Sequence, residues 1–438
     1  MNKLYLFLLL TSFFTAFSQD GFQFPPNKNK VTVPFQLSNN LVLIPIEING
    51  VTLNFLLDTG VEKTVLFSLE ETDSLQFNNV EKIRIKGLGV GKSLDALYSR
   101  GNKVVINGLE DKNHEVYIIL DQEVNFSAQL GIPVHGILGY HFFKHNFIEI
   151  DYKKKKLIIY KNKEVFSSKK LKQFDEIPIS IELEKPYVEA LVSLNDTEVN
   201  TKLLLDTGGS DAIWLFENKE SIKLPKNNFD DFLGRGFSGN IYGKRSRIDK
   251  FKIGKHEVMS PTISFPDTLS LKNVNMVQGR NGSLGGEFFK RFDVIFDYAN
   301  KKIYLKKNAD FNEPFNYNMS GIEVQHNGLQ WIKEEYQLKT RLVHEGLSFI
   351  DERPKEIKYD FILKPLYEVT NVRPNSPAAI AGIQIGDILA KVNGNHAFKY
   401  KLQEINNLMQ SEDGKWIYLE VERKDKLLKF RFQLKKIL

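Results

Sequence analysis

The sequence contains one unit written twice, and this internal repeat limits the possible folds more than any other feature. Leu53–Gly60 ends in Leu-Leu-Asp-Thr-Gly, and the same ending closes Thr201–Gly208, 148 positions later. Two further segments recur 146 positions apart: Gly136–Lys144 as Gly282–Lys290, and Phe147–Tyr152 as Asp293–Tyr298. Because these markers keep their order at nearly constant spacing, we expect two copies of a fold of roughly 130 residues.

Both copies have the composition of short β-strands. Apolar runs rich in Val, Ile, Thr and Phe are broken by Asn, Gly and Asp, which favour turns. Asn49-Gly50 between two such runs predicts a hairpin, and Asn195-Asp196 occupies the same place in the second copy. Short helices are expected at Tyr140–His145 and Gly286–Arg291.

The repeat also suggests a division of the chain into domains. The first copy takes residues 19–160 and the second takes residues 176–312, with a Lys- and Ser-rich linker at 161–175. A different module follows at 313–438, with an insertion near 335–365.

The first eighteen residues have the pattern of a secretory signal peptide. Lys3 precedes the apolar run Leu4–Phe17, and Ala16-Phe17-Ser18 fits the small-x-small rule for cleavage. The alternative is an uncleaved membrane anchor, for which the run is short. We therefore expect export. Because the chain has no cysteine, a bacterial periplasm, cell surface or secreted location is favoured over a eukaryotic secretory route.

Composition excludes several classes of function. The net charge of +6, from 60 basic and 54 acidic residues, is small for 438 residues and is not gathered in blocks. Nucleic-acid binding is therefore not expected as the main activity. Without cysteine, the chain has no disulfide, zinc-thiolate site or cysteine nucleophile.

The two Asp-Thr-Gly copies point to paired carboxyl chemistry. A single copy could be an ordinary strand and turn, in which the Asp accepts backbone hydrogen bonds. Two copies at matched places in a repeat place Asp58 and Asp206 side by side on a pseudo-two-fold axis. Two carboxyls at close range cannot both ionise cheaply, so one keeps its proton and the pair titrates as a unit. Such a pair can activate a water without a metal, another cofactor or a covalent intermediate.

These motifs resemble the aspartic proteases, and most closely the retropepsin-like group, here as a tandem pair in one chain covering about residues 30–310. The resemblance implies a mainly β fold with two acid-protease lobes of barrel-like β-structure related by pseudo-two-fold symmetry. It casts Asp58 and Asp206 as the catalytic pair, and it gives loop-supporting roles to Thr59, Gly60, Thr207 and Gly208. It also implies that Leu138-Gly139 and Leu284-Gly285 thread beneath the two Asp-Thr-Gly loops.

The resemblance also implies substrate-contacting segments. Glu62 falls where retroviral enzymes place an acid against the substrate main chain, and the second copy has Ser210 there instead. Each copy has a glycine-rich segment that matches a flap hairpin closing over substrate, and the sequence leaves open which flap closes. The flap glycines are Gly87, Gly89 and Gly91 in the first copy, and Gly234, Gly236 and Gly239 in the second.

The last module resembles a bacterial PDZ domain, an α+β fold built on a small β-barrel. Ser376–Leu389 leads to Val392-Asn393-Gly394, with a helix expected from the Ser-Pro cap to Gly382. A second helix at Lys401–Gln410 would flank a groove that binds a peptide as an added strand. We expect the carboxylate-binding loop near Ile362–Leu366, which has no glycine, so capture of a free C-terminus is in doubt. The alternative is a PDZ-like fold that only packs on the lobes.

No metal site is expected. His141 and His145 are four residues apart, but the pattern provides no nearby acid. The sequence as a whole predicts an exported aspartic endopeptidase that hydrolyses an extended polypeptide through water activated by Asp58 and Asp206. One alternative is a non-cleaving peptide-binding or scaffold protein that keeps the protease fold and uses its PDZ domain. Another is a processing enzyme of narrow specificity. Expected partners are a polypeptide substrate and a peptide ligand of the PDZ domain.

Overall fold

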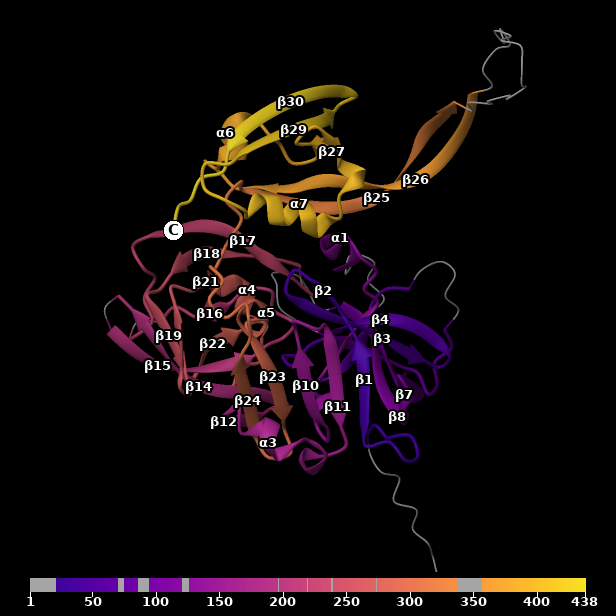
Figure 1. Ribbon diagram of the computed structural model, residues 1–438, viewed down its shortest axis with the longest axis vertical. Helices are drawn as coiled ribbons and strands as arrows, with labels where there is room; N and C mark the ends of the chain where they lie inside the picture. The colour runs from indigo at the N-terminus through magenta and orange to yellow at the C-terminus, as the bar shows by residue number, and fades with distance from the viewer. Residues whose placement is uncertain are drawn as a thin grey trace, which may run out of the picture.

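The computed structural model describes residues 21–69, 75–85, 94–119, 126–195, 197–218, 220–237, 239–272, 274–337 and 357–438. Within these ranges the protein is mainly β, with two β-rich lobes and a smaller domain above them in Figure 1. The signal peptide expected at 1–18 lies outside these ranges. No helix within them is long and apolar enough to span a membrane.

The first lobe is built on one mixed sheet. Its strands, in spatial order, are β2 (Gln36–Ser38), β3 (Leu41–Ile48), β4 (Val51–Leu57), β9 (Gly136–Leu138), β5 (Thr64–Leu66), β8 (Leu109–Ile119), β7 (Leu94–Ile106) and β6 (Glu81–Ile85). The hairpin expected at Asn49-Gly50 is confirmed: it joins β3 to β4, and both turn residues have positive φ.

The second lobe repeats this arrangement. Its strands, in spatial order, are β17 (Asn228–Gly236), β18 (Gly239–Arg247), β21 (Thr262–Pro266), β16 (Ile213–Leu215), β22 (Arg280–Leu284), β15 (Thr197–Leu205), β14 (Lys185–Leu194), β19 (Lys250–Ile253) and β20 (His256–Met259), with β13 (Ser180–Glu182) paired to β14. The turn expected at Asn195-Asp196 lies between β14 and β15, which pair antiparallel. Asp196 itself lies outside the described residues.

A six-stranded sheet beneath both lobes joins them. Its strands, in order, are β1 (Lys30–Pro34), β11 (Lys156–Tyr160), β10 (Phe147–Asp151), β23 (Phe292–Asp297), β24 (Lys302–Lys307) and β12 (Asp175–Pro178). At its centre β10 pairs antiparallel with β23, and Glu149 lies opposite its own repeat equivalent, Ile295. The pseudo-two-fold axis therefore passes through this pair of strands.

Short helices complete the lobes. They are α1 (Phe126–Leu130), α2 (Tyr140–Phe143), α3 (Ser168–Leu171), α4 (Thr268–Leu271), α5 (Gly286–Phe289) and the 3-10 turn η1 (Lys163–Val165). Helices α2 and α5 confirm the two expected after the Leu-Gly pairs. The segment expected as a linker, 161–175, contains η1 and α3 and leads into β12.

The C-terminal domain has its own sheet and its own core. The strands are β25 (Ile322–Gln337), β26 (Ile357–Val372), β27 (Ile388–Val392), β29 (Trp416–Arg423) and β30 (Lys426–Gln433), with β28 (Asn395–His396) beside β27. The helical elements are α6 (Pro377–Ala381), the 3-10 turn η2 (Ala397–Lys399) and α7 (Leu402–Met409), and α6 and α7 are as expected. Of the insertion expected near 335–365, residues 335–337 and 357–365 lie on β25 and β26, which form an arm that projects away from the lobes in Figure 1. Residues 338–356 lie outside the described ranges.

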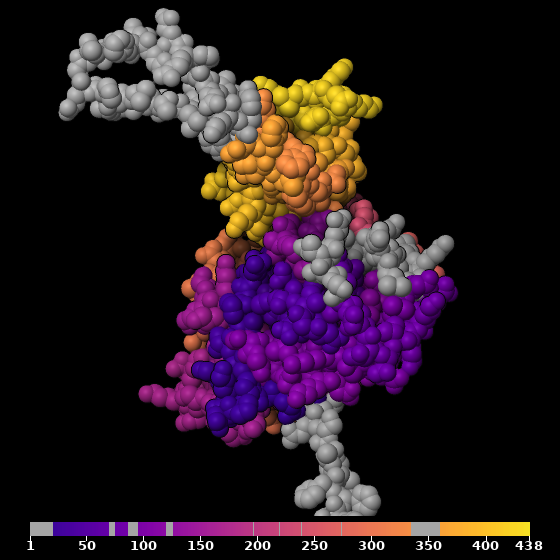
Figure 2. All heavy atoms as spheres, turned by 90° about the vertical axis from the view of Figure 1, so that its right-hand side faces the viewer, coloured from indigo at the N-terminus to yellow at the C-terminus, as the bar shows by residue number. Residues whose placement is uncertain are grey.

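Figure 2 shows the C-terminal domain seated on the two lobes through a narrower waist. Helix α1 of the first lobe packs against β25. The backbone N–H of Asn39 donates to Gln403 Oε1 on α7 at 2.5 Å. On the second lobe, the rings of Phe229 and Tyr317 lie 5.4 Å apart. The domain therefore contacts both lobes.

Candidate active site

The two Asp-Thr-Gly loops are held by equivalent strands. Strand β4 runs parallel to β9, and β15 runs parallel to β22. Each ladder continues one residue beyond its strand. The Asp58 N–H donates to the carbonyl of Leu138 at 3.1 Å, and the Asp206 N–H donates to that of Leu284 at 2.9 Å. The repeat therefore delivers both aspartates to the same place by the same backbone geometry.

Two buried threonines lock the loops together across the axis. The Thr59 N–H donates to Thr207 Oγ1 at 3.1 Å, and the Thr207 N–H donates to Thr59 Oγ1 at 2.9 Å. Each hydroxyl in turn donates to the other lobe: Thr59 to the carbonyl of Leu205 at 2.7 Å, and Thr207 to that of Leu57 at 2.8 Å. Four interlobe hydrogen bonds thus fix the separation of the aspartates.

Glycine is required after each threonine because the opposite aspartate is too close for a side chain. A Cβ at Gly208 would lie 2.1 Å from Asp58 Oδ2, and one at Gly60 would lie 2.8 Å from Asp206 Oδ1. The amides are used as well: Gly60 donates to Asp58 Oδ1 at 2.7 Å, and Gly208 donates to Asp206 Oδ1 at 3.1 Å.

The carboxyls of Asp58 and Asp206 hydrogen-bond to each other, and they differ in acidity. Burial, followed by the charge of Asp206, raises the pKa of Asp58 well above its usual range. Burial also raises the pKa of Asp206, but the positive charge of Arg280 opposes this rise. Because both pKa values are raised and that of Asp58 more strongly, we expect the pair to hold one proton between them.

Glu62 forms an ion pair between the lobes. Its carboxylate pairs with Lys185 Nζ of the second lobe at 3.1 Å, and the neighbouring Lys63 pairs with Glu184 at 3.2 Å. The contact of Glu62 with a substrate main chain, expected from the resemblance, stays a prediction. At the equivalent second-lobe position, the carbonyl of Ser210 accepts from the Asn40 side chain at 3.0 Å.

The second-lobe flap is the hairpin of β17 and β18. Gly236 lies opposite Gly239 at its tip, and Gly234 and Gly239 have φ of 136° and 113°, which suit glycine. Phe237 at the tip reaches the first lobe, where its ring centroid lies 6.2 Å from that of Phe67 and 5.8 Å from that of Phe126. This flap therefore crosses between the lobes. The first-lobe flap glycines Gly87, Gly89 and Gly91 lie outside the described residues.

A buried chain of charges, which the sequence did not reveal, runs from the second active-site loop through this flap into the C-terminal domain. Asp211 accepts from Arg245 Nη1 at 3.0 Å, and Arg245 Nε donates to Asp231 at 2.7 Å. Asp231 also accepts from Arg373 Nη1 at 3.1 Å. These residues are far apart in the sequence, so no local pattern could have indicated the chain.

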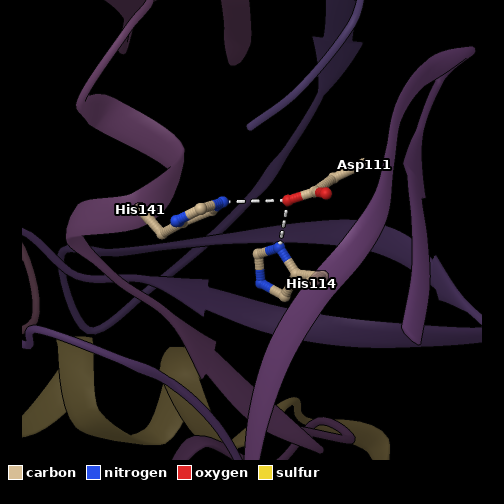
Figure 3. Close-up of side chains that lie close together, drawn as sticks. All are labelled: Asp111, His114 and His141. Carbon is tan, nitrogen blue, oxygen red and sulfur yellow. Dashed lines mark hydrogen bonds and ion pairs between the residues drawn. The ribbon is translucent and has the colours of Figure 1, made fainter. Parts of the chain in front are cut away.

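A second buried cluster lies behind the first active-site turn (Figure 3). Asp111 Oδ2 accepts from His114 Nδ1 at 2.8 Å and from His141 Nε2 at 2.9 Å, while His114 Nε2 lies 2.7 Å from Thr64 Oγ1. Sequence reasoning paired His141 with His145, whereas the fold brings it to Asp111 and His114. The atoms of Asp111, His114 and His141 that could bind a metal ion lie within 4.8 Å of one another, and carboxylate oxygens and imidazole nitrogens suit Zn²⁺. They already satisfy one another, so we assign the cluster a role in supporting β5, which begins at Thr64.

The expected carboxylate-binding loop is wrong. Ile362–Leu366 is not a loop: it lies inside β26, where residues 362–365 pair with β25. Strand β25 is an edge of this sheet, and a peptide can add as a strand at such an edge. Two N–H groups of the loop before β25, those of Ser320 and Gly321, donate to Asn318 Oδ1 at 3.1 and 3.0 Å. The Asn318 side chain therefore occupies these two N–H groups.

Comparison with known proteins agrees with these features. Residues 44–142 match the sequence model of the aspartyl protease family, and residues 368–423 match that of the PDZ domain. The protein thus combines an aspartic-protease-like fold with a C-terminal PDZ domain.

One similar solved structure is the aspartic proteinase from Irpex lacteus. It has a TM-score of 0.39 and 11% sequence identity, over 65% of this chain and 98% of that one. In the comparison with curated proteins, the sequence has no match.

Proposed function

We propose that this protein is an exported aspartic endopeptidase that cleaves extended polypeptides with water activated by Asp58 and Asp206. The observation that carries the proposal is the symmetric lock of the two Asp-Thr-Gly loops, which holds the buried carboxyl of Asp58 close to the half-buried carboxyl of Asp206. The apolar leader at 4–17 supports export.

The proposed reaction uses the difference in acidity between the two aspartates. Ionised Asp206 takes a proton from a water molecule as that water attacks the peptide carbonyl. Protonated Asp58 donates a hydrogen bond to the developing oxyanion, and the proton gained by the dyad later passes to the leaving amine. The Thr59 and Thr207 lock keeps both carboxyls in place, so no reorganisation is needed during the reaction.

The flap formed by β17 and β18 supplies the cover over the cleft in this proposal. Its tip, Phe237, packs on first-lobe aromatic residues, so a substrate enters when that contact opens. Closure excludes bulk water and strengthens the electrostatic interactions around the dyad.

The test is cleavage of a diverse peptide library by residues 19–438 between pH 4 and 7, with the products sequenced by mass spectrometry. The wild type is compared with the double variant Asp58→Asn/Asp206→Asn. The control is Asp230→Asn, which changes a surface aspartate on the flap whose side chain is 81% exposed. Cuts shared by the wild type and the control but absent from the double variant would support the proposal. A wild type that binds peptides without cleaving them would instead favour a peptide-binding protein with a protease fold.

A further inference from the structure

At equivalent positions of the repeat, the two lobes carry side chains of different chemical character. In the first lobe, one sheet face carries an apolar cluster that also packs against the flap tip Phe237. Its members include Leu41, Leu43, Val134 and Ile137. This cluster is separate from the main core on the other face of the sheet. The wall facing the flap is therefore apolar in the first lobe.

Strand register identifies the equivalent positions in the second lobe. Leu43 pairs with Leu56 in the first lobe, and Tyr187 pairs with Leu204, the repeat equivalent of Leu56, in the second. Two residues earlier on the same strands, Leu41 corresponds to Lys185.

Strands β9 and β22 extend the comparison. Ile137 pairs with Leu56, and Ser283 pairs with Leu204, so Ile137 corresponds to Ser283. At the repeat spacing of 146, Val134 corresponds to Arg280. The positions that are aliphatic in the first lobe thus carry two cations, a phenol and a hydroxyl in the second.

Arg280 is half-buried, and within the described part of the chain it has no carboxylate partner. Its Nε donates to the carbonyl of Gly282 at 3.1 Å, and its guanidinium lies 5.2 Å from the centroid of the Phe216 ring. Among the described residues no Asp or Glu forms an ion pair with it, and burial lowers its pKa. Arg280 begins β22, and Leu284 at the end of the same strand accepts the Asp206 N–H, so the strand runs from Arg280 to the dyad. The charge of Arg280 acts on Asp206 accordingly. A cation that is partly removed from water and has no partner is costly unless an anion joins it.

The hydroxyl of Tyr187 is a second polar group in this part of the second lobe that lacks a partner. Its side chain is 1% exposed, and its hydroxyl has no hydrogen-bond partner. It lies close enough to Arg280 and Asp206 for their charges to act on it. Buried hydroxyls are nearly always hydrogen-bonded, so this one marks a place for a ligand atom or a water.

We propose that Arg280 and Tyr187, with Lys185 beside them, form a subsite for a carboxylate of the bound peptide. The apolar wall of the first lobe then takes an aliphatic or aromatic side chain elsewhere along the same peptide. Arginine suits a carboxylate because its planar N–H groups can donate in pairs. This inference rests on the proposed function, since it names the substrate class of the same cleft.

The test measures peptide binding and cleavage separately. Binding is followed by fluorescence anisotropy on the full-length Asp58→Asn chain, with peptides that carry Glu or Gln at each position in turn. Each peptide is made with a free and with an amidated C-terminus, which distinguishes a side-chain carboxylate from a terminal one. Cleavage of the same set is measured with the wild-type aspartates.

The predicted result is a preference of about 10-fold or more for a carboxylate at one position, lost when Arg280→Gln is added. Arg280→Lys should keep part of the preference, and Arg280→Glu should favour a Lys at that position instead. The control is Lys255→Gln, in the turn between β19 and β20 of the same lobe. The Lys255 side chain is 68% exposed and pairs with Asp175 at 3.4 Å.

Three outcomes would overturn the inference: no carboxylate preference, a preference that survives Arg280→Gln, or one that Lys255→Gln abolishes equally. Failure of the protease proposal would look different. The Glu preference in binding would persist and depend on Arg280, while the wild-type aspartates would cleave none of the peptides.

Discussion

Asp231 of the flap and Arg373 of the PDZ domain form a buried ion pair, with Oδ1 and Nη1 3.1 Å apart and both side chains less than 10% exposed. Asp231 simultaneously binds Arg245, which binds Asp211, five residues after Asp206. The PDZ domain is therefore tied to the strands that carry the flap tip. Its position and that of the flap are expected to change together.

Loss of this ion pair should destabilise the protein and impair the flap. Arg373→Gln leaves Asp231 with one cationic partner instead of two, and we expect a loss of about 3 kcal/mol in the free energy of unfolding. Urea denaturation measures the loss, and a double-mutant cycle with Asp231→Asn isolates the pair. Arg431→Gln, an exposed position on β30, is the control. A loss no larger than that of the control would contradict the coupling.

The flap tip should contribute to substrate capture more than to stability. Phe237→Ala removes the contacts with Phe67 and Phe126, so the closed position is favoured less. We expect kcat/KM to fall about 10-fold with little change in Tm. The control is Tyr242→Ala, on the same hairpin but 44% exposed. Equal effects from both variants would show that the tip has no special role.

The threonine lock should tolerate serine and reject valine. Thr59→Val keeps the shape but removes the hydroxyl that donates to Leu205 and accepts from Thr207. We expect a loss of about 2 kcal/mol in stability, because buried partners are left unsatisfied, together with a loss of activity. Thr59→Ser should retain most of both. The same pair of substitutions at Thr207 should behave alike, and clearly unequal results would contradict the symmetric lock.

The contact between the PDZ domain and the flap should weaken as pH rises. Burial and the charge of Asp231 raise the pKa of Glu323 to about 8, opposed by Arg245 and Arg373. The folded state therefore binds a proton that the unfolded state releases near pH 4.5. Stability from this group is full below that pH and is lost as pH rises toward 8. Thermal melts between pH 5 and 9 measure it. Glu323→Gln should flatten this part of the profile, and an unchanged profile would exclude Glu323 as its source.

Local patterns in the sequence were sufficient for the elements that local residues determine. The repeat predicted the two lobes, Asn49-Gly50 predicted a hairpin, and Ser376-Pro377 predicted the start of α6, where Ser376 Oγ accepts from the Ala379 N–H. The proximity of Asp58 and Asp206 also follows from the repeat. Their catalytic role stays a prediction.

Contacts between distant side chains were not predictable in the same way. Nothing near Glu62 indicates that Lys185 will neutralise it, and nothing near His141 indicates that Asp111 will accept its N–H. The carboxylate-binding loop was placed at Ile362–Leu366 because the sequence does not show that β26 begins as early as Ile357. The polar character of Tyr187 and Arg280 is visible in the sequence, but its meaning depends on the register that aligns them with Leu43 and Val134.

The central claim is that Asp58 and Asp206 act as one unit with a single shared proton. Its most direct test is kcat/KM for one cleaved peptide across pH, measured for the wild type, Asp58→Asn and Asp206→Asn, with folding of each checked by thermal melting. We expect a bell-shaped pH profile of kcat/KM for the wild type and a loss of roughly 10³-fold or more in the kcat/KM of each variant. A folded single variant that retains near-wild-type activity would contradict it.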